Sequence, residues 1–309
     1  MGHPGAIVER LPAIRILKKM IKLSYHMPDS GGPKVPVLMY HGVSKTTDER
    51  ARSTNPAYCL SPQAFREQMN WLAENHVPTL SLQTLLEPQS LHDGKAVVIT
   101  FDDGWLNNYT DAFPILKEHG LSATVFVATG FMGSPGYLTW GQLKEMDRGG
   151  ITVQSHTVSH RPLLGLSRQE LKTELESSKK TIEDRLGKMV EFLSLPHGRF
   201  NQNIVELAGA LGYRAVCTSE PGYSHDFSST AVFKRINVPD TWTVLTFEQA
   251  ICCNPLTILP AQLSKRTKNF AKAVLGFNTY RKLYELRYRI KGSDRMLARD
   301  GKTPEGKKQ

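Results

Sequence analysis

The sequence predicts an α/β fold built on a parallel β-sheet. Short apolar segments alternate with amphipathic ones along most of the 309 residues, which is the pattern of strands joined by crossover helices. Three of the apolar segments end next to polar side chains, at 102–103, 156 and 197. Because parallel strands carry an active site at their carboxyl ends, these polar residues are expected to meet there.

The expected strands are short and rich in β-branched or aromatic residues. The segment Ala96-Val97-Val98-Ile99-Thr100-Phe101 shows this composition clearly, and 122–129 repeats it. In chain order, strands are predicted at 35–40, 96–101, 122–129, 151–154, 191–195, 215–218 and 232–238.

Helices are predicted where apolar residues recur at helical spacing. Ser61 and Pro62 open the first, in which Phe65, Met69 and Leu72 share one face. The longest opens with a capping box at 167–170. The helices of the body are predicted at 61–74, 107–118, 139–148, 167–187 and 203–211.

Two adjacent carboxylates, Asp102 and Asp103, end the strand 96–101 and precede Gly104. Like charges this close raise one of the two pKa values unless a cation neutralises one carboxylate. The pair therefore indicates a metal or a protonated carboxyl, although an Asp-Asp-Gly turn that caps a helix is the simpler alternative.

A pair of histidines, His156 and His160, follows the apolar run 151–153. Two imidazoles four residues apart can bind one metal ion, but a zincin would need glutamate where Thr157 stands. One carboxylate and two imidazoles leave coordination positions open, as a catalytic zinc site requires.

A third motif, Leu195-Pro196-His197-Gly198, completes a combination that is much more specific than any of its parts. Together the three motifs resemble the polysaccharide deacetylases of carbohydrate esterase family 4, the NodB-homology group. The resemblance covers roughly residues 35–250. The opening Val35-Pro36-Val37-Leu38-Met39-Tyr40-His41-Gly42-Val43 resembles the branch that deacetylates poly-N-acetylglucosamine exopolysaccharides. The family implies a distorted (β/α) barrel of about seven parallel strands, here with N- and C-terminal helical extensions.

The resemblance also implies the roles of five residues. Asp103, His156 and His160 would hold a divalent metal, most often zinc in this family, and Asp102 would be the general base. His41 is the candidate acid for the leaving nitrogen, because the usual Leu-x-His motif is not evident; a histidine that caps a turn is the alternative.

The third motif departs from the family pattern at two positions. Ser194 stands where most members have arginine, and His197 stands where they usually have tyrosine. The backbone N–H after the proline helps to bind the oxyanion in the family, and His197 can still supply it. Arg235 is the candidate replacement for the missing arginine, although it could equally be an ordinary surface or ion-pair arginine.

The formal net charge of +10 is carried by one segment. Residues 265–309 hold 14 Lys or Arg and 4 Asp or Glu, so the rest of the chain holds 25 of each sign (39 − 14 and 29 − 4). Residues 7–24 also show a basic amphipathic pattern. Both ends are expected to bind an anionic membrane surface or, alternatively, to pack on the barrel. The predicted domains are 1–34, 35–264 and 265–309.

Four cysteines without a CxxC pair favour a reducing compartment, and the charged N-terminal segment lacks the apolar core of a signal peptide. We therefore expect a cytoplasmic protein, peripherally bound to membrane through its basic ends.

The resemblance implies a metal-dependent hydrolase of exopolysaccharide biosynthesis. It would remove acetyl groups from N-acetylated sugars of a polysaccharide, glycolipid or lipid-linked precursor. Hydrolysis of a non-sugar amide on the same fold and a non-catalytic carbohydrate-binding relative are the alternatives, and Asp102 argues against the second. An iron(II) oxygenase site is disfavoured by the paired aspartates. Nucleic acid is not expected as a partner, because the body shows no motif for it.

Overall fold

The computed structural model describes residues 34–44, 58–87, 95–223 and 230–275. The chain divides into two compact units, Met1–Asn254 and Pro255–Gln309, which we describe separately. Nearly all of the predicted N-terminal extension, and the tail beyond residue 275, lie outside the described residues. The predicted domain boundaries therefore stay predictions.

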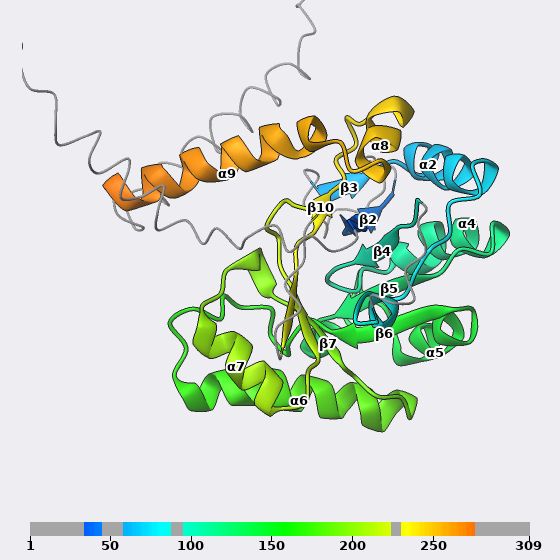
Figure 1. Cartoon of the computed structure of the whole chain (residues 1–309). Coiled ribbons are helices and arrows are strands. Elements are labelled where there is room, and N and C mark those ends of the chain that lie inside the picture. Colours follow the sequence, from blue (N-terminus) through cyan, green and yellow to red (C-terminus); the bar gives the residue numbers. More distant parts are fainter. Residues whose placement is uncertain (1–33, 45–57, 88–94, 224–229, 276–309) are drawn as a thin grey trace, which may run out of the picture. The chain divides into compact units, whose positions relative to one another are not determined.

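A curved, eight-stranded parallel sheet forms the first unit, with strand order β10-β1-β4-β5-β6-β7-β8-β9 (Figure 1). This confirms the predicted α/β fold and its barrel-like sheet. The strands are β1 (Val37–Tyr40), β4 (Val98–Phe101), β5 (Ala123–Val127), β6 (Ile151–Ser155), β7 (Phe192–Ser194), β8 (Ala215–Cys217), β9 (Ala231–Phe233) and β10 (Ile236–Asn237). A separate two-stranded sheet pairs β2 (Gly42–Val43) with β3 (Cys59–Leu60).

The segment 232–238, predicted as one strand, is two strands on opposite edges of the sheet. β9 pairs with β8, and β10 pairs with β1 at the other edge. Only Lys234 and Arg235 join them. The chain therefore crosses the gap in the barrel at Arg235, and this accounts for eight strands where about seven were expected.

The predicted helices lie around the outside of the sheet (Figure 1). Their N-termini follow the capping pattern, since Ser61 Oγ accepts from Ala64 N–H and Ser167 and Glu170 form a capping box. The predicted helices are α2 (Pro62–Glu74), α4 (Phe113–Glu118), α5 (Trp140–Arg148), α6 (Arg168–Leu186) and α7 (Gln202–Ala210). Two further helices, α3 (Leu82–Leu85) and α8 (Val244–Ile251), were not predicted. The expected start of the helix at 107 is instead a π-helical turn, Asn108–Ala112, that leads into α4.

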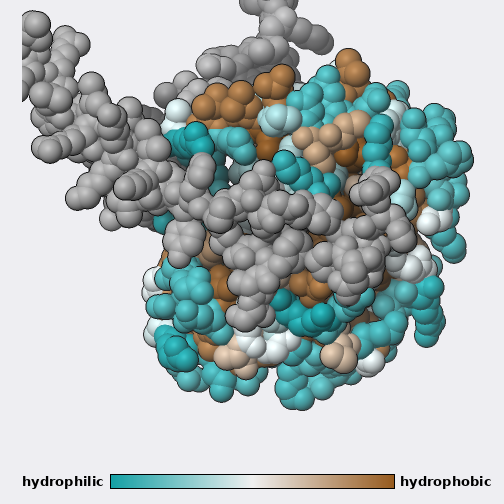
Figure 2. All heavy atoms as spheres, in the orientation of Figure 1, coloured by the Kyte–Doolittle hydropathy of each residue, from teal (hydrophilic) through white to brown (hydrophobic). Residues whose placement is uncertain are grey.

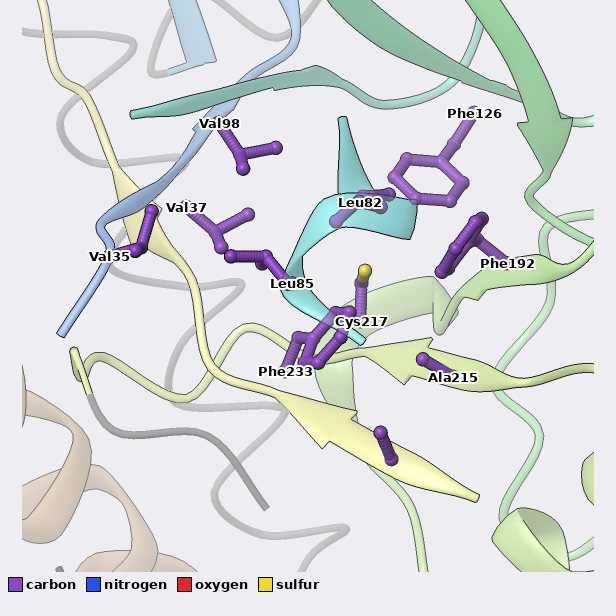
Figure 3. Packing of buried hydrophobic residues seen from close by; sticks show 11 residues of the cluster. Val35, Val37, Leu82, Leu85, Val98, Phe126, Phe192, Ala215, Cys217 and Phe233 are labelled. Carbon is purple, nitrogen blue, oxygen red and sulfur yellow. The ribbon is translucent and has the colours of Figure 1, made fainter. Parts of the chain in front are cut away.

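A hydrophobic cluster fills the inside of the sheet towards the amino ends of the strands. Figure 3 shows Leu82 and Leu85 of α3 pointing into this cluster between side chains of the surrounding strands. Its buried members are Val35, Val37, Leu82, Leu85, Val98, Phe126, Phe192, Ala215, Cys217, Ala231 and Phe233. Because α3 packs into this end, the carboxyl ends of the strands are left to form a site.

The second unit contains α9 (Pro255–Leu275). Leu256, Leu259, Leu263 and Phe270 of this helix are exposed by 69%, 42%, 50% and 47%. Within the residues that the structure describes, no helix combines the length and apolar character required to cross a membrane.

Candidate active site

The two carboxylates at the end of β4 face different surroundings. Asp102 continues the strand pairing by donating its N–H to Tyr40 O at 3.0 Å, and it is buried. Asp103 and Gly104 then take left-handed backbone conformations, with φ of 76° and 77°. The left-handed conformation favours glycine at position 104, and a Cβ there would also approach Val127 Cγ1 to 3.0 Å.

Asp103 meets the two predicted histidines at the carboxyl end of β6. Its Oδ1 lies 3.1 Å from His160 Nε2 and 3.4 Å from His156 Nε2. His156 Nδ1 donates to Ser194 O at 2.8 Å, which leaves the Nε2 lone pair directed at Asp103 in the neutral ring. The structure thus brings together all three predicted metal ligands.

These three side chains fit a divalent cation. Their ligand atoms lie within 4.8 Å of one another. Asp103 Oδ1 is buried and accepts no hydrogen bond within the described residues, so the most polar atom of the group lacks the partner that a cation would supply. Two imidazoles and one carboxylate are a donor set that zinc accepts, with positions left for other ligands.

The loop that carries His160 is held in a strained conformation by Glu174 of α6. Thr157 and His160 have φ of 68° and 54°, which costs free energy for residues with side chains. The buried Glu174 carboxylate accepts from the N–H groups of Val158 at 3.0 Å and Ser159 at 2.9 Å, and from Ser159 Oγ at 2.5 Å. It thereby fixes the loop between the two histidines.

Sequence reasoning missed Glu174, although the pattern of α6 contains a signal for it. Glu174 lies between Leu171 and Leu175 on the buried face of an otherwise polar helix. A carboxylate on the buried stripe of an amphipathic helix needs buried donors, and here they are the N–H groups of the histidine loop.

Arg235 forms a buried, bidentate ion pair with Asp102. Nη1 donates to Oδ1 at 2.8 Å and Nη2 donates to Oδ2 at 2.7 Å. Arg235 Nη2 also donates to Ser194 Oγ at 2.8 Å, and Nε donates to Thr218 O at 3.0 Å. Arg235 is only 1% exposed, so the alternative of an ordinary surface arginine is wrong.

The contacts of Ser194 explain why a serine can stand where the family pattern has arginine. Ser194 Oγ accepts from Arg235 and donates to Asp102 Oδ2 at 3.1 Å, and its side chain is fully buried. A small residue at the end of β7 leaves room for a guanidinium that arrives from the β9–β10 connection. Arg235 therefore takes the place beside Asp102 that sequence reasoning proposed for it.

The environment of Asp102 determines its charge. Burial by itself raises the pKa of this carboxyl, but the charge and hydrogen bonds of Arg235, with the nearby His156, lower it to about 2. Asp102 is therefore ionised at neutral pH, as an acceptor of protons must be.

His41 follows β1 at the same end of the sheet. Asn108 Nδ2 donates to its carbonyl oxygen at 2.6 Å, and its ring lies 4.7 Å from that of Tyr58, centroid to centroid. Burial lowers the pKa of His41 below its usual value, and the charges of Asp102 and Asp103 offset this only in part. Its Nδ1 is buried without a hydrogen-bond partner in the described residues. Its role as an acid stays a prediction.

His197 lies in the turn after β7, with φ of 58°. Its ring centroid is 5.0 Å from that of His160, which places the side chain beside this candidate metal ligand. The following Gly198 has no room for a Cβ, which would approach Ser219 Cβ to 2.5 Å. The turn is therefore closely packed against Ser219. Binding of the oxyanion by the His197 N–H stays a prediction.

Comparisons with known proteins agree with this geometry. The model of the polysaccharide deacetylase family matches residues 90–216. YxkH of Bacillus subtilis (strain 168), itself assigned to the polysaccharide deacetylases, is 32% identical over 229 residues, which are 73% of this chain and 79% of that protein.

Two further relatives carry more specific names. The poly-beta-1,6-N-acetyl-D-glucosamine N-deacetylase of Staphylococcus aureus (strain MRSA252) is 26% identical over 171 residues, 49% of this chain and 59% of that protein. The structure of the Streptococcus pyogenes deacetylase PplD in complex with acetate superposes with a TM-score of 0.66 and 28% identity, over 71% of this chain and 99% of PplD. From its motifs, fold and relatives, the chain belongs to the polysaccharide deacetylases, carbohydrate esterase family 4.

Proposed function

We propose that this protein is a metal-dependent deacetylase that removes acetyl groups from N-acetylated sugars of a polysaccharide, glycolipid or lipid-linked precursor. The observation that carries the proposal is the open Asp103–His156–His160 group beside an ionised Asp102. The Staphylococcus aureus relative is named for an N-acetylglucosamine polymer, which supports an N-acetylated saccharide here.

Asp103, His156 and His160 would hold the metal, and the donor set favours zinc. When bound, this ion supplies a lowered water pKa and polarisation of the acetyl carbonyl. Asp102 takes the proton of the attacking water, while Arg235 holds the carboxylate in place. The His197 N–H stabilises the developing oxyanion. His41 protonates the sugar nitrogen as the carbon–nitrogen bond breaks, giving acetate and a free amine.

Mass spectrometry of candidate substrates tests the reaction. N-acetylglucosamine oligomers and lipid-linked N-acetylated sugars would be incubated with zinc-loaded protein, with chelator-treated protein as control. We expect the loss of one acetyl mass and release of acetate only with metal. Binding of the sugars without acetate release would favour the carbohydrate-binding alternative, and hydrolysis of cyclic ureides alone would favour the non-sugar amidase.

A substitution tests the acid. His41→Ala is expected to lower turnover by about 10²–10⁴-fold, the usual contribution of a positioned acid or base. Metal content should stay at the wild-type level, since His41 is not among the residues that converge on Asp103. Wild-type turnover in the variant would remove His41 from the mechanism.

We propose further that the protein acts inside the cell at an anionic membrane surface. The support comes from α9, where the exposed apolar residues Leu256, Leu259, Leu263 and Phe270 follow one another at intervals of three, four and seven, and so share one face of the helix. In Figure 2, brown residues gather at the top of the view, where Figure 1 draws the first turns of α9.

The charge around this face suits an anionic surface. Lys265, Arg266 and Lys268 belong to the same helix, and residues 265–309 carry a net charge of +10 (14 − 4). Each basic residue near an anionic bilayer contributes about 1 kcal/mol. An exposed apolar stripe with adjoining cationic residues is the pattern of an interfacial helix.

Sedimentation with phosphatidylglycerol vesicles tests membrane binding. We expect the full chain to bind at low salt and to dissociate at high salt, and the double variant Leu259→Asp/Leu263→Asp to bind far less. Met189→Asp is the matched control, because Met189 is 72% exposed on the first unit. Equal sedimentation of all three proteins, or of none, would contradict the proposal.

A further inference from the structure

We propose that Trp105 is a positioning residue that restricts Asp103 to binding metal through a single oxygen. This inference rests on the metal site proposed above. Trp105 Nε1 donates to Asp103 Oδ2 at 2.9 Å. The indole is only 8% exposed. The metal-ligating carboxylate thus has one oxygen held by an N–H donor and the other, Oδ1, directed at the two histidines.

The backbone makes this short-range hydrogen bond possible. Asp103 and Gly104 are both left-handed, with φ of 76° and 77°, so the chain reverses before Trp105. The side chain two residues after the carboxylate can therefore turn back towards it. In a helix, side chains two residues apart do not face each other, and in a strand they share a face but start from Cα atoms about 7 Å apart.

The indole is itself held in place by the loop before α5. The ring of Tyr137 stacks on that of Trp105, with centroids 4.4 Å apart and planes 21° apart, and Phe131 packs against Tyr137. Leu106 N–H donates to Gly136 O at 2.8 Å, which ties the two segments together at the backbone. The N–H donor is therefore oriented before any metal binds.

The hydrogen bond from Trp105 is expected to affect both the affinity for metal and the number of ligand atoms that Asp103 supplies. Hydrogen bonds to the unused atoms of a metal ligand typically contribute about 10–100-fold in metal affinity. An Asp103 carboxylate without this donor can rotate, and its Oδ2 can become a second ligand atom. That second oxygen would take a coordination position that water or the substrate oxygen needs.

Trp105→Phe tests the proposal, because it keeps an aromatic ring against Tyr137 and removes the donor. We expect zinc affinity, measured by competition with a chelating dye, to fall about 10–100-fold. The melting temperature of the metal-free protein should change little. In the cobalt-substituted protein, weaker visible absorption in the variant would report a higher coordination number.

Trp71→Phe is the matched control. Trp71 packs on Phe247 of α8, and Lys95 lies over its ring, so this change should leave zinc affinity and the cobalt spectrum at wild-type values. Tyr137→Leu is the second variant, which keeps the indole but removes the ring that orients it, and a smaller loss of affinity is expected.

The outcomes separate two kinds of failure. Wild-type zinc affinity in both Trp105→Phe and Tyr137→Leu would overturn the role of Trp105 and leave the proposed function intact. No zinc binding by the wild-type protein would instead contradict the metal site itself. An equal loss of affinity in Trp71→Phe would show a general effect of tryptophan replacement and would also overturn the proposal.

Discussion

Replacing Asp102 by asparagine is expected to reduce turnover by about 10²–10⁴-fold, because a positioned general base contributes that much. Asparagine keeps the size of the side chain but cannot accept the proton of the attacking water. The three candidate metal ligands do not include Asp102. Bound zinc, measured by mass spectrometry of the native protein, should therefore stay at one ion per chain.

Asp103→Asn and Asp184→Asn complete this experiment. Asp103→Asn is expected to lose both zinc and activity, since it removes the charged ligand. Asp184 is 61% exposed and pairs with Lys180 on α6, so its replacement should leave both unchanged. Wild-type turnover in Asp102→Asn would show that the roles of the two adjacent carboxylates have been assigned wrongly.

Arg235→Met should give the largest loss of stability. Removing one partner of a buried ion pair costs about 3–5 kcal/mol, because the other charge stays buried without compensation. Arg235 and Asp102 are 0% and 4% exposed in their side chains, so solvent cannot replace the guanidinium. For a domain of this size we expect the melting temperature to fall by about 6–20 °C.

The same substitution has a defined effect on pH dependence. Burial raises the pKa of Asp102, and Arg235 is the main group that opposes this. Without Arg235 the pKa rises, so the ionised base is lost at a higher pH and the acidic limb of kcat/KM moves upward. In the wild-type protein the pair stabilises the fold above the unfolded pKa of aspartate, and this contribution is lost as pH falls towards about 2.

A double variant distinguishes the charge effect from the loss of packing. In Arg235→Met/Asp102→Asn no unpaired charge is left in the interior, so part of the lost stability should return. A double variant as unstable as Arg235→Met would show that packing of the long side chain dominates. An unchanged acidic limb in Arg235→Met would contradict the control of Asp102 by Arg235.

The residues that could be predicted lie at the ends of strands with a clear local pattern. β4 and β6 each join a β-branched run directly to polar ligands, so Asp103 and His156 could be placed on one face from the parallel arrangement. Trp105 and Glu174 were harder to assign. The role of Trp105 depends on the turn at Asp103, and the role of Glu174 depends on the loop between Thr157 and His160. Both segments have positive φ values, which aspartate, threonine and histidine do not predict.

The sequence by itself determined the α/β class and indicated the three candidate ligands and the adjacent candidate base, because each stands within a few residues of a strand end. Tertiary structure decided what neutralises that base. Arg235 lies 133 residues from Asp102 in the chain and reaches it only because the strand predicted at 232–238 divides between two edges of the sheet. The sequence offered Arg235 only as one of two alternatives, since the same apolar run could form one strand or two. Closure of the barrel makes the difference: it leaves a buried carboxylate that requires a cation, and the chain supplies one where it crosses the gap.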